Sequence, residues 1–393
     1  MSTKKVAANI WKLYLIKSLS SMMFSIPIIV VFFQANGLTM RQVLSLQAIF
    51  SLSVILLEIP TGYFADIFGR KTSMIVGGLL ATTGFSIYSQ SAGFWGFLMA
   101  EIILGVGVSF TSGSDSAMLY ESLFEIGKET EYKKAQGRGF GLGLFSEGMT
   151  SIIGGFLALV TLRFPFYFDI LTYALVVPVA LTLFEPKRKL NNGAKNDWRK
   201  MLRIVRFALH EQMEVKWLII YSATVGASTL TMFWLTQPYL EATHVPLGLF
   251  GTALAIFLFC AAIFSWNAHR IEAFLGKKTA LVLLLILPSI GYALLSSVWV
   301  VWSGVFILLF YAARGINNPI TLDYINGLIS SDNRATVLSV KNLAVRIIFS
   351  IVGPLAGWAN DACSLRFALL FSGAIFLILG MVSLVFLKKH NAL

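Results

Sequence analysis

The sequence predicts an all-α membrane protein with twelve transmembrane helices in two pseudo-symmetric halves of six. Hydrophobic residues make up 57% of its 393 positions and charged residues only 13%, whereas about a quarter of the residues in a soluble domain are charged. Apolar runs of about 20 residues, long enough to span a bilayer, recur along the chain. A motif between two of these runs returns in the second half. An ordinary soluble domain is therefore excluded.

The first six apolar runs form the predicted N-terminal half, which we assign to residues 1–184. The sixth run is entered through Arg163 and Pro165. Proline inside a span is tolerated, because neighbouring helices supply partners for the freed backbone groups. The six predicted spans cover about 10–33, 43–61, 72–90, 94–119, 135–160 and 164–184.

One long hydrophilic stretch, residues 185–216, separates the two halves and is rich in lysine and arginine. Apolar residues recur within it at i, i+3, i+4 and i+7 spacing, among them Trp198, Met201, Leu202 and Val205. This pattern predicts an amphipathic helix with a basic polar face that lies in the inner leaflet interface. We interpret the stretch as a cytoplasmic linker between the halves.

Six further runs form the predicted C-terminal half, residues 217–393. The tenth span is expected to end in the polar stretch from Arg314 to Pro319, at the inner mouth of a central cavity. The six predicted spans cover about 217–240, 247–266, 279–297, 299–320, 335–359 and 365–387.

The basic residues predict the orientation of the chain in its membrane. With both termini in the cytoplasm, the outer loops hold little positive charge beyond Arg41, Arg163 and Arg366. This asymmetry satisfies the positive-inside rule. It also accounts for the net charge of +12 without a nucleic-acid partner, so we expect a multi-pass protein of the cell (inner) membrane in contact with lipids.

The most specific motif lies between the second and third spans, where Gly62–Lys71 reads Gly-Tyr-Phe-Ala-Asp-Ile-Phe-Gly-Arg-Lys. We interpret it as a tight cytoplasmic connection. Its spacing of Gly62, Asp66, Gly69, Arg70 and Lys71 resembles the loop signature of the major facilitator superfamily. The resemblance implies a monomeric transporter that moves a small molecule by alternating access and is neither an enzyme nor dependent on a cofactor.

The same resemblance assigns a cytoplasmic gate to this motif. In the family, the aspartate at the position of Asp66 meets the start of the eleventh helix when the transporter faces outward. Arg70 is expected to brace this corner against an acid at the end of the fourth span, either Asp115 or Glu121. Lys71 completes the set of predicted gate residues, together with the two glycines of the motif.

An internal repeat supports two six-helix halves. Gly276–Thr279 reads Gly-Lys-Lys-Thr and reproduces Gly69–Thr72, again between the second and third spans of its half. The copy is degraded, because His269 stands where Gly62 would be and Ala273 where Asp66 would be. Parallel six-helix halves are typical of transporters with a central site.

Ionisable residues at membrane depth are the candidate substrate and proton-coupling residues, because each is costly to insert. The candidates are Glu147, Glu101, Lys17, Arg346 and Arg314. Glu147 is the first choice for the proton carrier and Glu101 the second. Lys17 is expected to be neutralised by an acid of the N-terminal half, with Glu147 the first choice. No metal site or catalytic residue is predicted.

The direction of transport is left open by the fourth and fifth spans. Drug–proton antiporters of the family often carry an arginine where this chain has Glu101, although Gly105 and Gly107 match their pattern. The glycine-rich fifth span lacks the Gly-Pro pair of many exporters. Proton-coupled efflux is the favoured interpretation. The alternatives are a proton- or cation-coupled importer of a small organic anion, such as a siderophore-like or carboxylate substrate, and a receptor that transports nothing.

Overall fold

The computed structural model describes residues 2–186, 212–329 and 334–390. Throughout these residues the chain is helical, without a β-strand. Eleven helices in this part are long and apolar enough to cross a membrane. The predicted amphipathic helix of the linker falls almost entirely outside the described residues. The prediction of an all-α membrane protein is confirmed.

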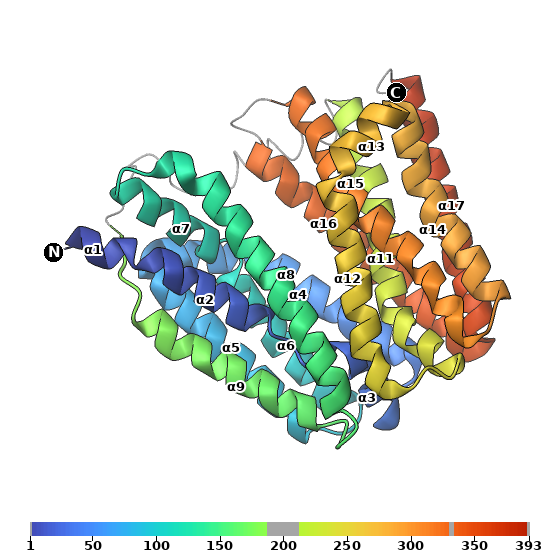
Figure 1. The fold of residues 1–393 in the computed structure, drawn as a ribbon, viewed down its shortest axis with the longest axis horizontal. Coiled ribbons are helices and arrows are strands. Elements are labelled where there is room, and N and C mark those ends of the chain that lie inside the picture. The colour runs from blue at the N-terminus through green and yellow to red at the C-terminus, as the bar shows by residue number, and fades with distance from the viewer. Residues whose placement is uncertain (1, 187–211, 330–333, 391–393) are drawn as a thin grey trace. The chain divides into compact units, whose positions relative to one another are not determined.

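The helices before the linker are labelled in Figure 1 in chain order. They are α1 (Ser2–Ala7), α2 (Asn9–Ser21), η1 (Ile26–Ile28), α3 (Ile29–Ala35), α4 (Met40–Phe68), α5 (Arg70–Gln90), α6 (Phe94–Thr111), α7 (Ser114–Glu125), η2 (Glu129–Glu131), α8 (Tyr132–Leu157) and α9 (Phe164–Leu181).

The helices after the linker follow the same order of long spans (Figure 1). They are α11 (Met213–Ala242), η4 (Leu247–Leu249), α12 (Phe250–Trp266), α13 (Ala268–Leu275), α14 (Lys277–Ser297), η5 (Val301–Ile307), α15 (Leu308–Leu328), α16 (Arg334–Ala362) and α17 (Leu365–Lys389).

Contacts within the chain divide it into two compact units. The first unit comprises Met1–Leu38, Ile49–Asn196 and Leu247–Ala255, and the second comprises Thr39–Ala48, Asp197–Pro246 and Ile256–Leu393. The units therefore differ from a simple cut at the linker, since each includes a short segment from the other side of it. The predicted boundaries at 184 and 217 stay a prediction.

In the first unit, α5 is packed between α6 and α9. It has 21 residues but is not one of the eleven apolar spans, because small and hydroxyl-bearing residues interrupt its apolar sequence. Those small residues permit close packing. A Cβ at Gly77 would lie 2.9 Å from the carbonyl oxygen of Gly107 on α6, so the two backbones approach closely at this point.

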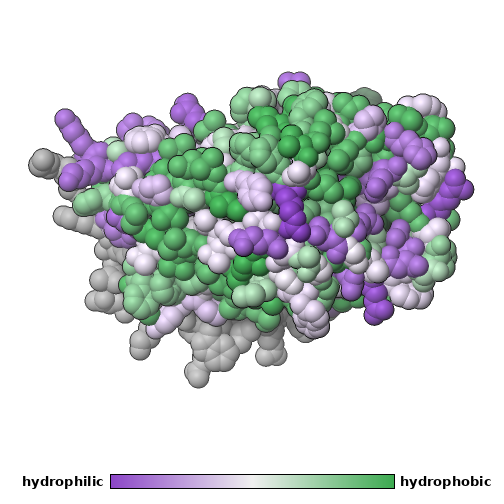
Figure 2. All heavy atoms as spheres, turned by 90° about the horizontal axis from the view of Figure 1, so that it is seen from below, coloured by the Kyte–Doolittle hydropathy of each residue, from purple (hydrophilic) through white to green (hydrophobic). Residues whose placement is uncertain are grey.

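In the second unit, α11 is the most buried span and packs against α15, α16 and α17. Leu218, Ile219, Leu281 and Leu284 are fully buried in its core. By contrast, large apolar side chains on many other helices are exposed, and Figure 2 shows wide hydrophobic areas on one face of the molecule. Exposed apolar surface of this extent is expected where helices meet lipid.

The predicted cytoplasmic connection at Gly62–Lys71 is wrong for most of its length. Helix α4 continues to Phe68, so the connection to α5 consists of Gly69 alone. Gly69 has a φ of +106°, which favours glycine. The apolar run ended before the helix did, because the last turns of α4 carry polar residues beyond the membrane.

Three other spans also differ from their predicted form. The first span is interrupted after Ser21, and the fourth is divided into α6 and α7 at Gly113, which has a φ of +77°. The tenth span starts as a 3₁₀ helix and continues to Leu328, so its predicted end at Pro319 is wrong. Proline within a membrane helix removes one hydrogen bond without ending it.

The repeat is visible in the local geometry. Gly276 alone connects α13 to α14, as Gly69 alone connects α4 to α5. Gly276 has a φ of +75°, and each glycine directly precedes a basic pair. The repeated sequence therefore makes the same turn in both places.

Candidate functional site

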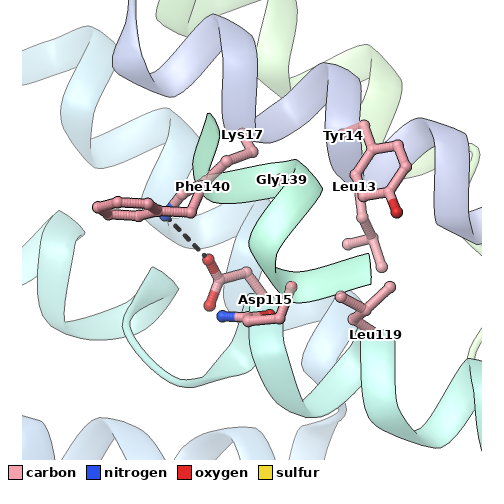
Figure 3. A pocket seen from close by; sticks show the side chains of 8 residues that line it. Leu13, Tyr14, Lys17, Asp115, Leu119, Gly139 and Phe140 are labelled. Atoms are coloured by element: carbon pink, nitrogen blue, oxygen red, sulfur yellow. Dashed lines mark hydrogen bonds and ion pairs between the residues drawn. The ribbon is translucent and has the colours of Figure 1, made fainter. Parts of the chain in front are cut away.

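Lys17 and Asp115 form an ion pair at a pocket in the first unit. Lys17 Nζ lies 3.4 Å from Asp115 Oδ2, and Figure 3 shows the lysine of α2 and the aspartate of α7 directed towards each other. The cavity measures about 60 Å³, and its other walls come from α2, α7 and α8. The lining residues are Leu13, Tyr14, Lys17, Asp115, Leu119, Gln136, Gly139 and Phe140.

This ion pair corrects two of the sequence predictions. Lys17 pairs with an acid of the first unit, as expected, but that acid is Asp115 rather than Glu147. Asp115 was expected near Arg70 as one of two possible partners. The division of the fourth span at Gly113 explains both results, because Asp115 then lies in the first turn of α7 and faces α2.

We expect Lys17 and Asp115 to be energetically coupled. Lys17→Ala should lower the apparent melting temperature of the purified protein in detergent more than the double change Lys17→Ala/Asp115→Ala lowers it. The coupling should be about 1 kcal/mol or less, because both side chains are partly exposed. The matched control is Lys17→Ala with Glu147→Ala, where the effects should add. A larger coupling to Glu147 than to Asp115 would contradict the assignment.

Glu147, the predicted proton carrier, is half-buried on α8. Its carbonyl oxygen accepts a hydrogen bond from the hydroxyl of Ser151. Both Glu147 and Asp169 interact electrostatically with Tyr173 of α9. The hydroxyl of Tyr173 donates to the carbonyl oxygen of Ser20 at 2.8 Å. Glu147 therefore belongs to a polar region shared by α2, α8 and α9.

Glu101, the second choice, is more deeply buried, with 3% of its surface exposed. It lies on α6 and interacts electrostatically with the buried Tyr88 of α5. Tyr88 in turn packs among the aromatic rings of Phe33, Phe97 and Phe166. Glu101 and Glu147 are thus held by different helices and have different neighbours.

The predicted cations of the second unit have distinct surroundings. Arg346 is half-buried on α16, whereas Arg314 is exposed on α15 with its guanidinium 6.0 Å from the ring centre of Tyr311. This distance is at the limit of a cation–π contact.

Sequence reasoning missed Lys341 of α16, which is only 3% exposed. Its Nζ donates to Asn318 Oδ1 at 2.6 Å and to Thr321 Oγ1 at 3.3 Å. The structure prints no carboxylate partner for it among the described residues. A lysine seven residues inside a predicted span was a visible signal of a functional position.

The predicted gate residues of the first unit come together around Arg70. Its guanidinium lies 2.7 Å from Asp66 and 3.7 Å from Glu121, so Glu121 is the brace that the sequence analysis expected. Gly62 lies on α4 with open space beside it. Lys71 is half-buried at the start of α5.

Glu185 is a further residue of this corner that the sequence did not reveal. Its carboxylate accepts hydrogen bonds from the backbone N–H groups of Arg70, at 2.8 Å, and Lys71, at 3.0 Å. It therefore satisfies the free donors at the start of α5. A Cβ at Gly69 would lie 3.1 Å from this carboxylate. The contact joins residues 115 positions apart, which no local pattern indicates.

Comparisons with known proteins agree with this arrangement. The sequence model described as Major Facilitator Superfamily matches residues 13–237, more than half of the chain. The tetracycline resistance protein of class H from Pasteurella multocida is 23% identical over 302 residues, which cover 75% of this chain and 73% of that protein. The class B protein from Escherichia coli is 21% identical over 316 residues, which cover 79% and 76%.

Two solved structures show the same fold. The nucleoside transporter NupG superposes with a TM-score of 0.78 and 13% identity, covering 98% of each chain. A bacterial homologue of the human lysosomal transporter Spinster, inward-facing and unoccupied, superposes with a TM-score of 0.74 and 15% identity, covering 99% of this chain and 97% of that one. At such identities the likeness concerns the fold alone.

Proposed function

The chain belongs to the major facilitator superfamily, and we propose that it exports a small organic molecule in exchange for protons. As a member of that family it is a multi-pass membrane transporter and not an enzyme. The observation that carries the proposal is the set of buried or half-buried acids in the first unit, Glu101, Glu147 and Asp169. Acids at membrane depth are typical of proton relays in transporters.

Outward transport is favoured by the relatives. Two of them are named for tetracycline resistance, and an exporter of a drug confers resistance to it. We infer a substrate of similar character, a small and largely apolar organic molecule. Alternating access between two six-helix halves, with boundaries at 184 and 217, would carry it across the membrane.

A second candidate is import of a small organic anion, coupled to protons or another cation. Lys341 favours it, because this buried cation is bound only to the neutral oxygens of Asn318 and Thr321. An anionic group on a substrate would compensate its charge. Arg346 and Arg314 on the same two helices would add to the attraction.

We further propose a monomer in the inner membrane, surrounded by lipid, with both termini in the cytoplasm. The distribution of basic residues supports this orientation. Reporter domains fused to each terminus test it, since a reporter active only in the periplasm should stay inactive at both ends.

Flux in proteoliposomes tests the transport proposal. Purified protein is first screened by thermal shift against drugs, siderophores, sugars and amino acids, with tetracycline as the first probe. The stabilising compound is then followed under an imposed pH gradient, with a pH-sensitive dye inside the vesicles. Exchange of substrate against protons supports export, whereas cotransport in one direction supports the importer. Flux that ignores the gradient contradicts both.

We expect Asp66 to close the cytoplasmic gate. Its contact with Arg70 positions it, and the gate contact would form only in the outward-facing state. Asp66→Asn should therefore shift the population towards inward-facing states, because the contact stabilises one state alone. Paired spin labels on the two halves measure the shift. Asp66→Glu, which keeps the charge, is the control, and unchanged distances in Asp66→Asn would rule out the gating role.

A further inference from the structure

The first membrane span is interrupted near its middle. Helix α2 ends at Ser21, residues 22–25 are not helical, and the 3₁₀ helix η1 begins at Ile26 before α3 continues the span. Backbone N–H and C=O groups lose their helical partners at such a break. Because lipid offers none, these groups must be satisfied by other parts of the protein.

Helix α9 supplies those partners with three side chains. The carboxylate of Asp169 accepts from the N–H of Phe24 at 2.6 Å and from the N–H of Ser25 at 3.2 Å. Thr172 donates to the carbonyl oxygen of Met22 at 3.3 Å. Tyr173 donates to the carbonyl oxygen of Ser20. One face of α9 thus holds both ends of the break.

Helix α8 closes the break from another side. A Cβ at Gly154 would overlap the carbonyl oxygen of Phe24 and lie 2.8 Å from its carbonyl carbon. The backbone of the break is therefore in direct contact with the backbone of α8. Its position is fixed between two helices, and Asp169 is the one ionisable residue that binds it.

Asp169 is completely buried. The other titratable groups on the packed helices are Tyr173 on α9 itself, Glu147 on α8 and Tyr88 on α5, of which the first interacts electrostatically with both Asp169 and Glu147. A second carboxylate nearby adds repulsion to the cost of burying the charge of Asp169. The two N–H donors from the break offset part of this cost.

The nearby cations are engaged elsewhere. Lys17 on α2 is paired with Asp115. Arg163, the residue before α9, donates to the carbonyl oxygens of Ser89 at 2.6 Å and Ser91 at 2.9 Å, and to the side chain of Asn36. No ion pair to Asp169 is found within the described part of the chain. Its ionised form therefore depends on Phe24 and Ser25.

The site also has a place for a proton. The buried hydroxyl of Ser25 has no hydrogen-bond partner in the described structure, although the N–H of the same residue binds Asp169. When Asp169 takes up a proton, the new O–H can donate to this hydroxyl. The protonated oxygen becomes a weaker acceptor, so the N–H of Ser25 is released.

We propose that Asp169 is a proton-binding site whose occupancy sets the geometry of the break in the first span. The ionised carboxylate holds Phe24 and Ser25 against α9, and the protonated acid lets go of one of them. Because the same span carries Lys17 and the pocket beside it, proton uptake would be transmitted to that pocket. This inference rests on the proposed proton coupling, yet it concerns a different acid from Glu147.

Hydrogen–deuterium exchange on the purified full-length protein tests the proposal without any substrate. The peptide that includes residues 22–28 is followed over a pH series, after correction for intrinsic exchange rates. In the wild type its protection should fall with a single midpoint as the pH is lowered. Asp169→Asn should exchange roughly tenfold faster at every pH, which corresponds to the loss of one hydrogen bond to a charged acceptor, and should show no midpoint.

Thr172→Val is the matched control, because it removes a hydrogen bond to the same break without removing an ionisable group. It should exchange faster than the wild type but keep the midpoint. Loss of the midpoint in Thr172→Val, or protection in the wild type that does not change with pH, would overturn the proposal.

Infrared spectroscopy provides a measurement that needs no variant, in case Asp169→Asn does not fold. Asp169 is the only aspartate among the buried residues of the described chain. Labelling aspartate with ¹³C should therefore shift one carbonyl band of a buried carboxylic acid, and that band should appear with the midpoint of the exchange experiment. A labelled protein without the band excludes Asp169 as the proton site, while proton-coupled flux would still uphold the proposed function.

Discussion

Replacing Gly154 with alanine should prevent the protein from folding or leave it severely destabilised. The added methyl group would overlap the carbonyl group of Phe24, which is backbone and has no rotamer to change. The neighbouring N–H groups are tied to Asp169, so the break in the first span cannot move aside. Overpacking typically costs about 1–3 kcal/mol, and a clash between two fixed backbones should reach or exceed the upper value.

Gly141→Ala is the matched control on the same helix. A Cβ at Gly141 would meet nothing within 4 Å, and alanine is favoured over glycine inside a helix by about 1 kcal/mol. We therefore expect normal yield and an unchanged or higher apparent melting temperature for Gly141→Ala. For Gly154→Ala we expect little monodisperse protein by size-exclusion chromatography. Equal behaviour of the two variants would show that α8 and the first span can separate locally.

The fold could be predicted because its signals are local. Composition and the length of the apolar runs indicate a membrane protein, and the spacing of Gly62, Asp66, Gly69 and Arg70 identifies the corner between α4 and α5. The brace from Arg70 to Glu121 was expected for the same reason, since it was inferred from the motif. Helix ends were predicted less well, because α4 and α15 continue beyond their apolar runs.

The partners of buried charges could not be predicted to the same degree. Lys17 lies on a helix that contacts both α7 and α8, so sequence alone could not choose between Asp115 and Glu147. The choice depends on Gly113, which divides the fourth span and directs Asp115 towards α2. Asp169 was visible as an acid within a span, but its role depends on the interrupted backbone of a different span.

Glu147 is placed where α2 and α8 approach closely. One turn before it, a Cβ at Gly143 would lie 2.8 Å from the hydroxyl oxygen of Ser21. Next to it, the hydroxyls of Ser18 and Ser146 are 2.5 Å apart. Movement between these helices would change the surroundings of the carboxylate, and hence its affinity for a proton. This alternation is what a proton carrier requires.

Glu147→Gln should therefore abolish substrate accumulation driven by a pH gradient, while substrate binding and passive exchange remain measurable. Glutamine keeps the size of the side chain but cannot carry a proton. The energy lost is considerable, since one charge moved through 100 mV corresponds to about 2.3 kcal/mol. Accumulation in proteoliposomes measures the first property and counterflow without a gradient measures the second. Glu101→Gln is the comparison, because Glu101 is an acid of the same unit with different neighbours. Accumulation at the wild-type rate in Glu147→Gln, together with its loss in Glu101→Gln, would transfer the role to Glu101.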